Sequence, residues 1–195
     1  MVKERYANIA QSGNSCCSPE CCIDEPSPVQ ILKMGQKIGY TKEQLTVGSG
    51  GANLGLGCGN PISVADLRPG ETVIDLGSGA GFDAFLAAKS VGPDGAVIGV
   101  DMTVEMISKA QKNVAQLGLE NVEFRLGEIE HLPVDDNSAD VVLSNCVINL
   151  SPNKTTVYGE IFRILKPGGR ISISDVLRLG DILKDLKDDS GAYTG

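Results

Sequence analysis

Residues 75–81, DLGSGAG, join one acidic side chain to three glycines at alternate positions. Glycine allows a tight reversal of the chain and lets a ligand approach the bare backbone. The apolar residues of 72–76 predict a buried parallel strand before the glycines, and those of 82–88 predict a helix after them. A ligand at this turn would face the free N–H groups of the first helical turn. The acid at the strand end suits a cation better than a pyrophosphate.

The spacing of the glycines is compatible with two kinds of nucleotide-binding turn. A dinucleotide fingerprint counted from Gly77 needs a third glycine where the chain has Phe82. The shifted register of Gly79, Gly81 and Ala84 fits that fingerprint but leaves two glycines outside the strand, so we rate it lower. The run D-x-G-x-G-x-G instead resembles motif I of class I S-adenosylmethionine (SAM) methyltransferases. A turn without a ligand is a weaker interpretation, because alternating glycines cost backbone entropy that a plain turn does not need.

Apolar runs that alternate with helical patterns predict an α/β fold with a doubly wound, Rossmann-like parallel sheet. The predicted strands are 72–76, 96–100, 122–126, 140–145 and 170–174, and the helices between them are 82–88, 104–117 and 154–165. A turn is expected at 167–169, and further helices at 2–10, 29–38, 61–67 and 179–190. We divide the chain into an N-terminal Cys-rich and glycine-rich cap, residues 1–68, and the sheet domain, residues 69–195.

Asp101 ends the second predicted strand, 24 residues after Gly77. An acid at this place and spacing binds the ribose hydroxyls of a nucleoside in folds of this kind. A helix N-cap is the alternative role, but Thr103 can serve as that cap. Glu128 and Ile129 follow the third strand, in the loop where this fold holds adenine.

Two of the six cysteines lie where the chain could close on a ligand. Cys146 directly follows the fourth strand, and ligands of open parallel sheets lie beyond the carboxyl ends of the strands. A buried structural cysteine is the alternative, but the position at the strand tip favours function. Cys58 lies in the glycine-dense segment 48–60, which we expect to be flexible and to close over a site.

The other four cysteines form two adjacent pairs in a segment rich in Ser, Pro and Gly: Cys16, Cys17, Cys21 and Cys22. Soft thiolates select soft ions, but this spacing is poor for one closed zinc site, which usually has two ligand pairs separated by a longer loop. A thiol relay or capture of a metalloid is the preferred interpretation. Adventitious metal binding ranks next, and the absence of any role ranks last.

The composition limits the possible partners. The chain has 195 residues, of which 42% are hydrophobic, and its 17 basic and 25 acidic side chains give a formal charge of −8. This balance disfavours nucleic acid and anionic membranes, which reward clustered Lys and Arg. No apolar run approaches the roughly 20 residues that span a bilayer, and the N-terminus lacks the apolar region of a signal peptide. We therefore expect a cytoplasmic protein whose cysteines are thiols.

Together, the motifs make the chain resemble the arsenite methyltransferases over nearly all its length. The more specific segments are 55–61 (GLGCGNP) and 145–150 (NCVINL), and the paired cysteines of 16–22 are similar to those of microbial members. Segments shared with most class I methyltransferases are 75–81, 99–103 (GVDMT), 127–133 (GEIEHLP) and 165–170 (LKPGGR). The resemblance implies methyl transfer from SAM to trivalent arsenic held by thiolates. It also implies a thiol reductant, glutathione or thioredoxin, as co-substrate.

The resemblance further implies roles for single residues. Cys58 and Cys146 would bind arsenic and act as the catalytic residues, and one or more of the N-terminal cysteines would deliver arsenic or shuttle electrons. Asp75, Gly77 and Gly79 would bind the methionine part of SAM, and Asp101 would bind the ribose. Met102 would contact the face of the adenine, and Glu128 and Ile129 would line its edge. The expected cofactor set is completed by Ser78, Gly81 and Asn145.

Arsenic(III) bound by thiolates keeps a lone pair that can attack the methyl group of a sulfonium in line. This chemistry needs positioning and the exclusion of water more than proton transfer. The sequence agrees, because its single histidine is His131 and no evident pair of side chains that could act as a general base lies near the strand ends. A lowered thiol pKa would help, since thiolates are the reactive form of cysteine.

The chain departs from the family pattern in one respect. Family members have a further arsenic-binding cysteine beyond the fifth strand and its helix, a seven-stranded sheet and a C-terminal domain, and this sequence stops before those parts. The usual residues therefore cannot complete a three-thiolate site, and the exposed sheet edge favours dimer pairing or aggregation. Two alternatives stay open: a general methyltransferase for a quinone or sterol-like acceptor, and a non-catalytic module that binds SAM or sequesters arsenic.

Overall fold

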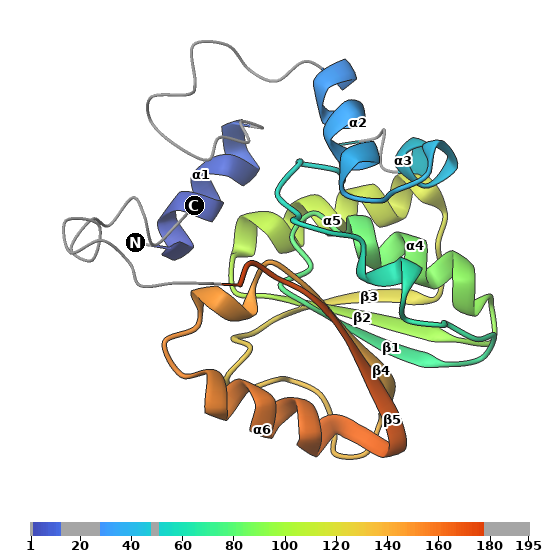
Figure 1. Cartoon of the computed structure of the whole chain (residues 1–195), viewed down its shortest axis with the longest axis vertical. Coiled ribbons are helices and arrows are strands. Elements are labelled where there is room, and N and C mark those ends of the chain that lie inside the picture. Colours follow the sequence, from blue (N-terminus) through green and yellow to red (C-terminus); the bar gives the residue numbers. More distant parts are fainter. Residues whose placement is uncertain (1, 13–27, 48–50, 178–195) are drawn as a thin grey trace.

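The computed structural model describes residues 2–12, 28–47 and 51–177, and its centre is a five-stranded parallel sheet (Figure 1). The strands are β1 (Thr72–Leu76), β2 (Ala96–Asp101), β3 (Val122–Leu126), β4 (Ala139–Asn145) and β5 (Leu165–Ser174), in the order β3-β2-β1-β4-β5. The chain winds outwards in both directions from the β1–β4 pair, which is the switch point where such sheets bind ligands. The predicted doubly wound, Rossmann-like sheet is confirmed.

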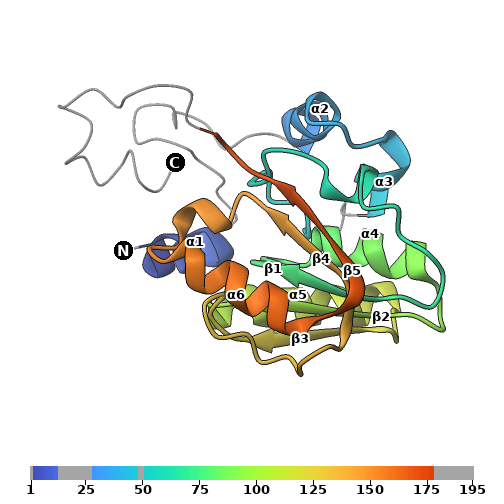
Figure 2. The ribbon, with the colours of Figure 1, turned by 60° about the horizontal axis from the view of Figure 1, so that its bottom comes forward.

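Helices cover both faces of this sheet, because its strands carry apolar side chains on both sides. α4 (Phe82–Val91) and α5 (Val104–Leu117) lie on one face, and α6 (Lys154–Ile164) lies on the other (Figures 1 and 2). Successive residues of β1 enter two separate cores. Val73 belongs to the core that contains Phe85 of α4, and Ile74 belongs to the core that contains Ile161 of α6. Packing on both faces holds the carboxyl ends of β1 and β4 in a fixed relation.

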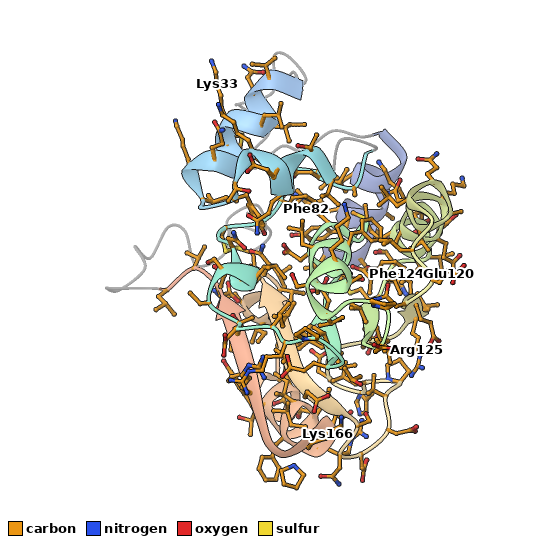
Figure 3. The ribbon with its side chains drawn as sticks, turned by 90° about the vertical axis from the view of Figure 1, so that its right-hand side faces the viewer. Lys33, Phe82, Glu120, Phe124, Arg125 and Lys166 are labelled. Atoms are coloured by element: carbon orange, nitrogen blue, oxygen red, sulfur yellow. A yellow bond between two sulfur atoms is a disulfide. The ribbon has the colours of Figure 1, made fainter. Side chains whose placement is uncertain are left out.

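The N-terminal helices pack against helices of the sheet domain. α1 (Val2–Ser12) contacts α5, and α2 (Pro28–Lys37) leads into the short α3 (Lys42–Val47), which contacts α4. The buried ring of Tyr40, between α2 and α3, has its centroid 5.0 Å from that of Phe82 at the start of α4. Figure 3 shows Phe82 beneath these helices and Lys166 at the opposite end of the sheet. The N-terminal segment therefore reaches the carboxyl end of the strands.

One predicted helix is wrong in extent. The helix expected at 61–67 is a single 3₁₀ turn, η1 (Pro61–Ser63), and Asp66 beyond it adopts a left-handed φ of 47°. That conformation ends a right-handed helical path. A second 3₁₀ turn, η2 (Ile148–Leu150), follows β4.

The turn expected at 167–169 is also placed differently, because it lies within β5. The pairing with β4 changes register there: Leu165 lies opposite Ala139, and Arg170 lies opposite Val141. Gly168 adopts a left-handed φ of 84° in the extra residues. The glycines therefore form an irregularity in an edge strand instead of a separate turn before it.

Some predictions fall outside the described residues: the helix at 179–190 and the cysteines Cys16, Cys17, Cys21 and Cys22. Within the described part of the chain, no helix has the length and apolar character needed to cross a bilayer.

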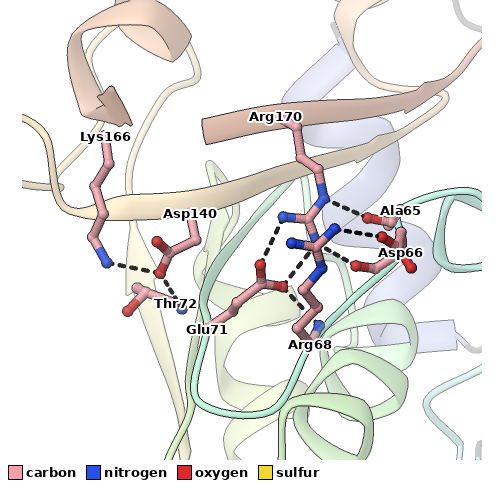
Figure 4. Close-up of polar contacts among 8 residues, drawn as sticks. All are labelled: Ala65, Asp66, Arg68, Glu71, Thr72, Asp140, Lys166 and Arg170. Carbon is pink, nitrogen blue, oxygen red and sulfur yellow. Dashed lines mark hydrogen bonds and ion pairs between the residues drawn. The ribbon is translucent and has the colours of Figure 1, made fainter. Parts of the chain in front are cut away.

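Arg170 joins edge strand β5 to the segment before β1 (Figure 4). Its guanidinium donates two parallel hydrogen bonds to the Glu71 carboxylate, at 2.7 and 2.8 Å, and others to the backbone carbonyls of Ala65 and Asp66. Only arginine offers this forked set of donors. These hydrogen bonds lower the pKa of Glu71 below its ordinary value of 4.5.

We expect Arg170→Lys to lower the free energy of unfolding by about 1–3 kcal/mol at neutral pH, because one amine cannot replace the fork. The folded-state pKa of Glu71 is depressed, so the stabilisation is present above the ordinary carboxyl pKa and is lost as the pH falls below it. Urea unfolding at about pH 7 and about pH 4 measures the difference. A gap between the two proteins that does not narrow at the lower pH would contradict this account.

Candidate functional site

The glycines after β1 turn the chain through left-handed conformations, with φ of 63° at Gly77, 52° at Gly79 and 96° at Gly81. Such angles favour glycine. Space is also short at two positions: a Cβ on Gly77 would lie 2.5 Å from a side-chain carbon of Val147, and one on Gly81 would lie 2.5 Å from Phe85. At Gly79 the nearest atom would be 4.0 Å away. The turn therefore leaves the backbone of Gly79 open to a ligand.

A cavity of about 640 Å³ lies at the carboxyl ends of β1 and β4. This volume is typical of a site for a small molecule or cofactor. The carboxyl groups that line it belong to Asp75, Asp83, Asp101, Glu128 and Glu130. The lining also includes His131, and no lysine or arginine of the described residues lines the cavity. The local field therefore favours a cationic ligand over a phosphate.

Asp75, on β1, is the most constrained of these acids. It is 2% exposed, and its Oδ2 has no hydrogen-bond partner among the described residues. Burial, and then the charges of Asp83 and Asp101, raise the pKa of Asp75 well above its ordinary value. An unpaired buried carboxyl oxygen is costly, so a cationic ligand group that donates a hydrogen bond to it would be stabilising.

Asp101, at the end of β2, connects the cavity wall to the glycine turn. One carboxylate oxygen accepts a hydrogen bond from the N–H of Gly79 at 3.0 Å, and the other accepts one from the N–H of Thr103 at 2.9 Å and one from its hydroxyl. Thr103 does occupy the N-cap position of α5, as expected, but its side chain makes no capping hydrogen bond. Burial raises the pKa of Asp101, and the hydrogen bonds from Thr103 and Gly79 oppose that rise.

The other residues predicted to bind the cofactor lie around the same cavity, with one exception. The lining includes Gly77, Ser78, Gly79, Met102, Glu128, Ile129 and Asn145. Gly81 is not among the lining residues, and its lack of a side chain instead lets Phe85 and Phe124 pack closely. The Oγ atom of Ser78 is buried and has no hydrogen-bond partner in the described part of the chain.

Cys58 and Cys146 are joined by a disulfide, with their Cα atoms 5.8 Å apart. The expectation of free thiols is therefore wrong for this pair, because the fold brings two residues 88 positions apart into bonding reach. Cys146 adopts a left-handed φ of 59°, and its N–H donates to the carbonyl oxygen of Ser174 at 2.8 Å. Cys146 lines the cavity, as does Gly57 beside Cys58. Cys58 is not itself among the lining residues, and its sulfur lies next to the cavity through its bond to Cys146.

Asn145 fixes the glycine-rich segment to the tip of β4. Its Oδ1 accepts a hydrogen bond from the N–H of Cys58 at 3.1 Å, and its Nδ2 lies 2.9 Å from the carbonyl oxygen of Gly59. The same Nδ2 lies 2.9 Å from Asp83 Oδ2 and 3.0 Å from the Tyr40 hydroxyl, which in turn donates to Asp83 Oδ1 at 2.6 Å. The amide that was predicted to contact the cofactor thus has protein partners for both of its polar atoms.

We expect Asn145→Ala to lower the free energy of unfolding by about 1–3 kcal/mol, because it leaves the N–H of Cys58 and the carboxylate of Asp83 with fewer partners. The segment around Cys58 should lose protection most. Native-state hydrogen exchange measured at residues 55–60 and at α6 checks this. Faster exchange spread equally over both regions would show a global effect and would contradict a specific role in holding this segment.

Sequence reasoning missed Tyr40, Asp83 and Asp175. Burial and the negative charge of Asp83 raise the pKa of Tyr40, and burial raises that of Asp83 against the hydrogen bonds from Asn145 and Tyr40. A signal existed for Asp83, which is an acid two residues after the last motif glycine. Tyr40 has none, since its partners lie 43 and 105 positions away. Asp175 directly follows β5, and one carboxylate oxygen lies within 4.8 Å of both cysteine sulfur atoms.

The fold and the glycine-turn site define the class of protein. The chain belongs to the methyltransferase family, because a family model described as "Methyltransferase domain" matches residues 67–195. The sheet and helices have the class I SAM methyltransferase fold.

Among known proteins, the chain is similar to arsenite methyltransferases. It is 53% identical to one from Halobacterium salinarum, over 100% of this chain and 51% of the relative, and 43% identical to one from Aquipseudomonas alcaligenes, over 98% and 54%. The chain thus spans about half the length of the curated relatives that it matches. A solved structure, an arsenic(III) S-adenosylmethionine methyltransferase from Chlamydomonas reinhardtii, is 40% identical with a TM-score of 0.57, over 74% of this chain and 48% of that one.

Proposed function

We propose that the chain transfers a methyl group from SAM to trivalent arsenic that is held by the thiolates of Cys58 and Cys146. The observation that carries this proposal is the meeting of these two cysteines at the edge of an acidic cavity beside the glycine turn. A methyltransferase for a quinone or sterol-like acceptor would have no need of two cysteines there. The names of the similar proteins agree with the proposal.

The residues around the cavity fit SAM. The unpaired Oδ2 of Asp75 suits the ammonium group of the methionine part, and the carboxylate of Asp101 keeps lone pairs for ribose hydroxyls. Met102 and Ile129 offer an apolar wall for adenine. When bound, SAM supplies an electrophilic methyl group on a positively charged sulfur. The acidic lining favours that charge.

The two cysteines would bind arsenic by ligand exchange. Two thiols displace two hydroxyl groups of arsenous acid, which leave as two molecules of water, and arsenic keeps its lone pair. Asn145 positions Cys58, and the contact of the Cys146 N–H with Ser174 positions the second sulfur. The contribution of the chain is then to hold arsenic next to the cofactor site and to exclude water.

A thiol reductant is part of this proposal, because the Cys58–Cys146 disulfide offers no thiolate. Two glutathione molecules, or one dithiol protein of the thioredoxin type, supply two electrons and two protons. Two thiols then form on this chain, and one disulfide forms on the reductant side. We assign delivery of arsenic or relay of electrons to the N-terminal cysteines, Cys16, Cys17, Cys21 and Cys22.

The cellular setting completes the proposal. We place the chain in the reducing cytoplasm, where such a reductant is present, and we expect no nucleic acid or membrane as partner, given its formal charge of −8. Pairing of two copies through the open edge of β5 is proposed as the route to a dimer. The cap of residues 1–68 and the methyltransferase domain of residues 69–195 are proposed as the two parts of the chain.

Turnover tests the proposal directly. The chain is incubated with SAM, arsenite and a thiol reductant, and methylated arsenic is measured by chromatography with elemental detection. Calorimetric titration with SAM and titration of reduced thiols with arsenite are run in parallel. Turnover supports the enzyme, binding of both ligands without turnover supports the non-catalytic module, and SAM binding without arsenite binding leaves only a methyltransferase for another acceptor.

A further inference from the structure

Three metal-ligating side chains meet at the carboxyl end of the sheet. The Sγ atoms of Cys58 and Cys146 and a carboxylate oxygen of Asp175 all lie within 4.8 Å of one another, and all three residues are half-buried. They come from the glycine-rich segment, the tip of β4 and the residue after β5. We propose that, once the disulfide is reduced, these side chains bind a divalent cation of the zinc class.

The donor atoms suit that class of cation. Two thiolates select Zn²⁺ or Cd²⁺ over Mg²⁺ or Ca²⁺, which prefer oxygen ligands throughout. Zinc sites with three protein ligands keep a fourth position for water or another ligand. The two thiolates and the carboxylate carry three negative charges, which a divalent cation offsets in large part.

Hydrogen bonds from Asn149 and Val176 hold the carboxylate of Asp175 in place. The backbone N–H of Asn149 donates to Oδ2 at 3.1 Å, and the side-chain amide of Asn149 donates to Oδ1 at 2.8 Å. The N–H of Val176 also donates to Oδ1, at 2.8 Å. Outer contacts of this kind orient the carboxylates that bind metals. The site therefore has a third ligand whose orientation does not depend on the cysteines.

The backbone around the two sulfur atoms is fixed as well. The N–H of Cys146 donates to the carbonyl oxygen of Ser174, one residue before Asp175, and the N–H of Cys58 donates to Asn145. The Sγ of Cys58 lies 3.6 Å from the same carbonyl oxygen of Ser174, a contact without a shared proton while the disulfide is intact. Reduction can therefore separate the sulfur atoms while their backbone stays in position.

The redox step needs an external reductant, and a phosphine serves in the test. The phosphine gives two electrons to the disulfide and leaves as the phosphine oxide with oxygen from water, and two thiols form on the chain. Binding of the cation then releases the thiol protons. This inference does not depend on the proposed function, because a cation can bind whether or not arsenic does.

The test uses the full chain with Cys16, Cys17, Cys21 and Cys22 replaced by serine, so that only two thiols remain. After anaerobic reduction and removal of phosphine, Zn²⁺ is titrated in competition with a chromophoric chelator, and Cd²⁺ is titrated by its thiolate charge-transfer absorption. We expect one cation per chain. Cys58→Ser should abolish binding, and Asp175→Asn should weaken it at least about tenfold, the least effect expected even for losing an outer contact of a metal ligand. Asp94→Asn, an exposed acid remote from the cluster in sequence, is the matched control.

The outcomes are distinct. No stoichiometric binding, or equal affinity in the Asp175→Asn and Asp94→Asn proteins, overturns the three-ligand site. Asp175→Cys distinguishes loss of a ligand from misfolding of the Asp175→Asn protein. A third thiolate in a correctly folded site should raise the affinity for Cd²⁺, and an unchanged affinity counts against the proposal. Arsenite added to the zinc-loaded protein should displace the cation. If zinc binds as expected and arsenite does not displace it, the proposed arsenic site fails while the cation site stands.

Discussion

Replacing Cys146 with serine should reduce arsenite methylation by at least about 100-fold and leave SAM binding within about twofold of the parent chain. Loss of one of the two thiolates removes a ligand that holds arsenic next to the cofactor. Misplacement of a reactant by about 1 Å already lowers the reaction rate about 100-fold. The serine hydroxyl is a poor ligand for a soft metalloid. Methylated arsenic in a fixed time, with calorimetric SAM titration alongside, gives both quantities.

A second substitution, in strand β4 just before Cys146, supplies the control. Ser144 lies two residues before Cys146, and its buried Oγ has no hydrogen-bond partner in the described residues. Ser144→Ala should therefore leave both methylation and SAM binding unchanged, whereas Cys58→Ser should reproduce the loss seen with Cys146→Ser. Full methylation by the Cys146→Ser protein would contradict the role of Cys146 in binding arsenic and would not affect the proposed SAM site.

Replacing Asp75 with asparagine should weaken SAM binding by about 10- to 100-fold, which corresponds to the loss of a charged hydrogen bond worth about 1.5–3 kcal/mol. The same substitution should raise the stability of the chain without ligand by about 1–3 kcal/mol, because it removes a carboxyl group whose ionised form is disfavoured by burial and by the charges of Asp83 and Asp101. A substitution that raises the stability of the chain and lowers its affinity for SAM would indicate that Asp75 serves ligand binding and not folding. Calorimetry and urea unfolding check the two effects, with Asp94→Asn as the surface control.

The pH dependence gives a separate check of this second prediction. The pKa of Asp75 is raised in the folded state, so the folded chain binds more protons than the unfolded chain above the ordinary value of 3.8. Stability without ligand should therefore fall as the pH rises from about 5.5 to about 8, a range above the ordinary pKa values of exposed carboxyl groups. Asp75→Asn should reduce this slope, and the raised pKa values of Asp83 and Asp101 account for the part that remains. An equal slope in both proteins would show that Asp75 is not among the groups that titrate.

The sequence alone was sufficient for the sheet and for much of the cavity wall. Strand β1, the glycine turn and α4 follow from local rules, because apolar runs, alternating glycines and helical spacing each act within a few residues. Asp75 and Asp101 could be placed at the cavity because parallel strands must end at one edge of a sheet. Boundaries failed where a left-handed residue, Asp66, or an irregular pairing, at Gly168, overrode the local pattern.

The tertiary structure decided what no local pattern contains. The disulfide between Cys58 and Cys146, the hydrogen bonds of Asn145 and the approach of Asp175 to the two sulfur atoms all join segments that are 29 to 117 positions apart in the sequence and meet only in the folded chain. Such contacts depend on how the glycine-rich segment crosses the ends of β4 and β5, and loop paths are set by packing and not by periodicity. The residue types therefore determined which chemistry is available, and the fold determined which atoms can share one ligand.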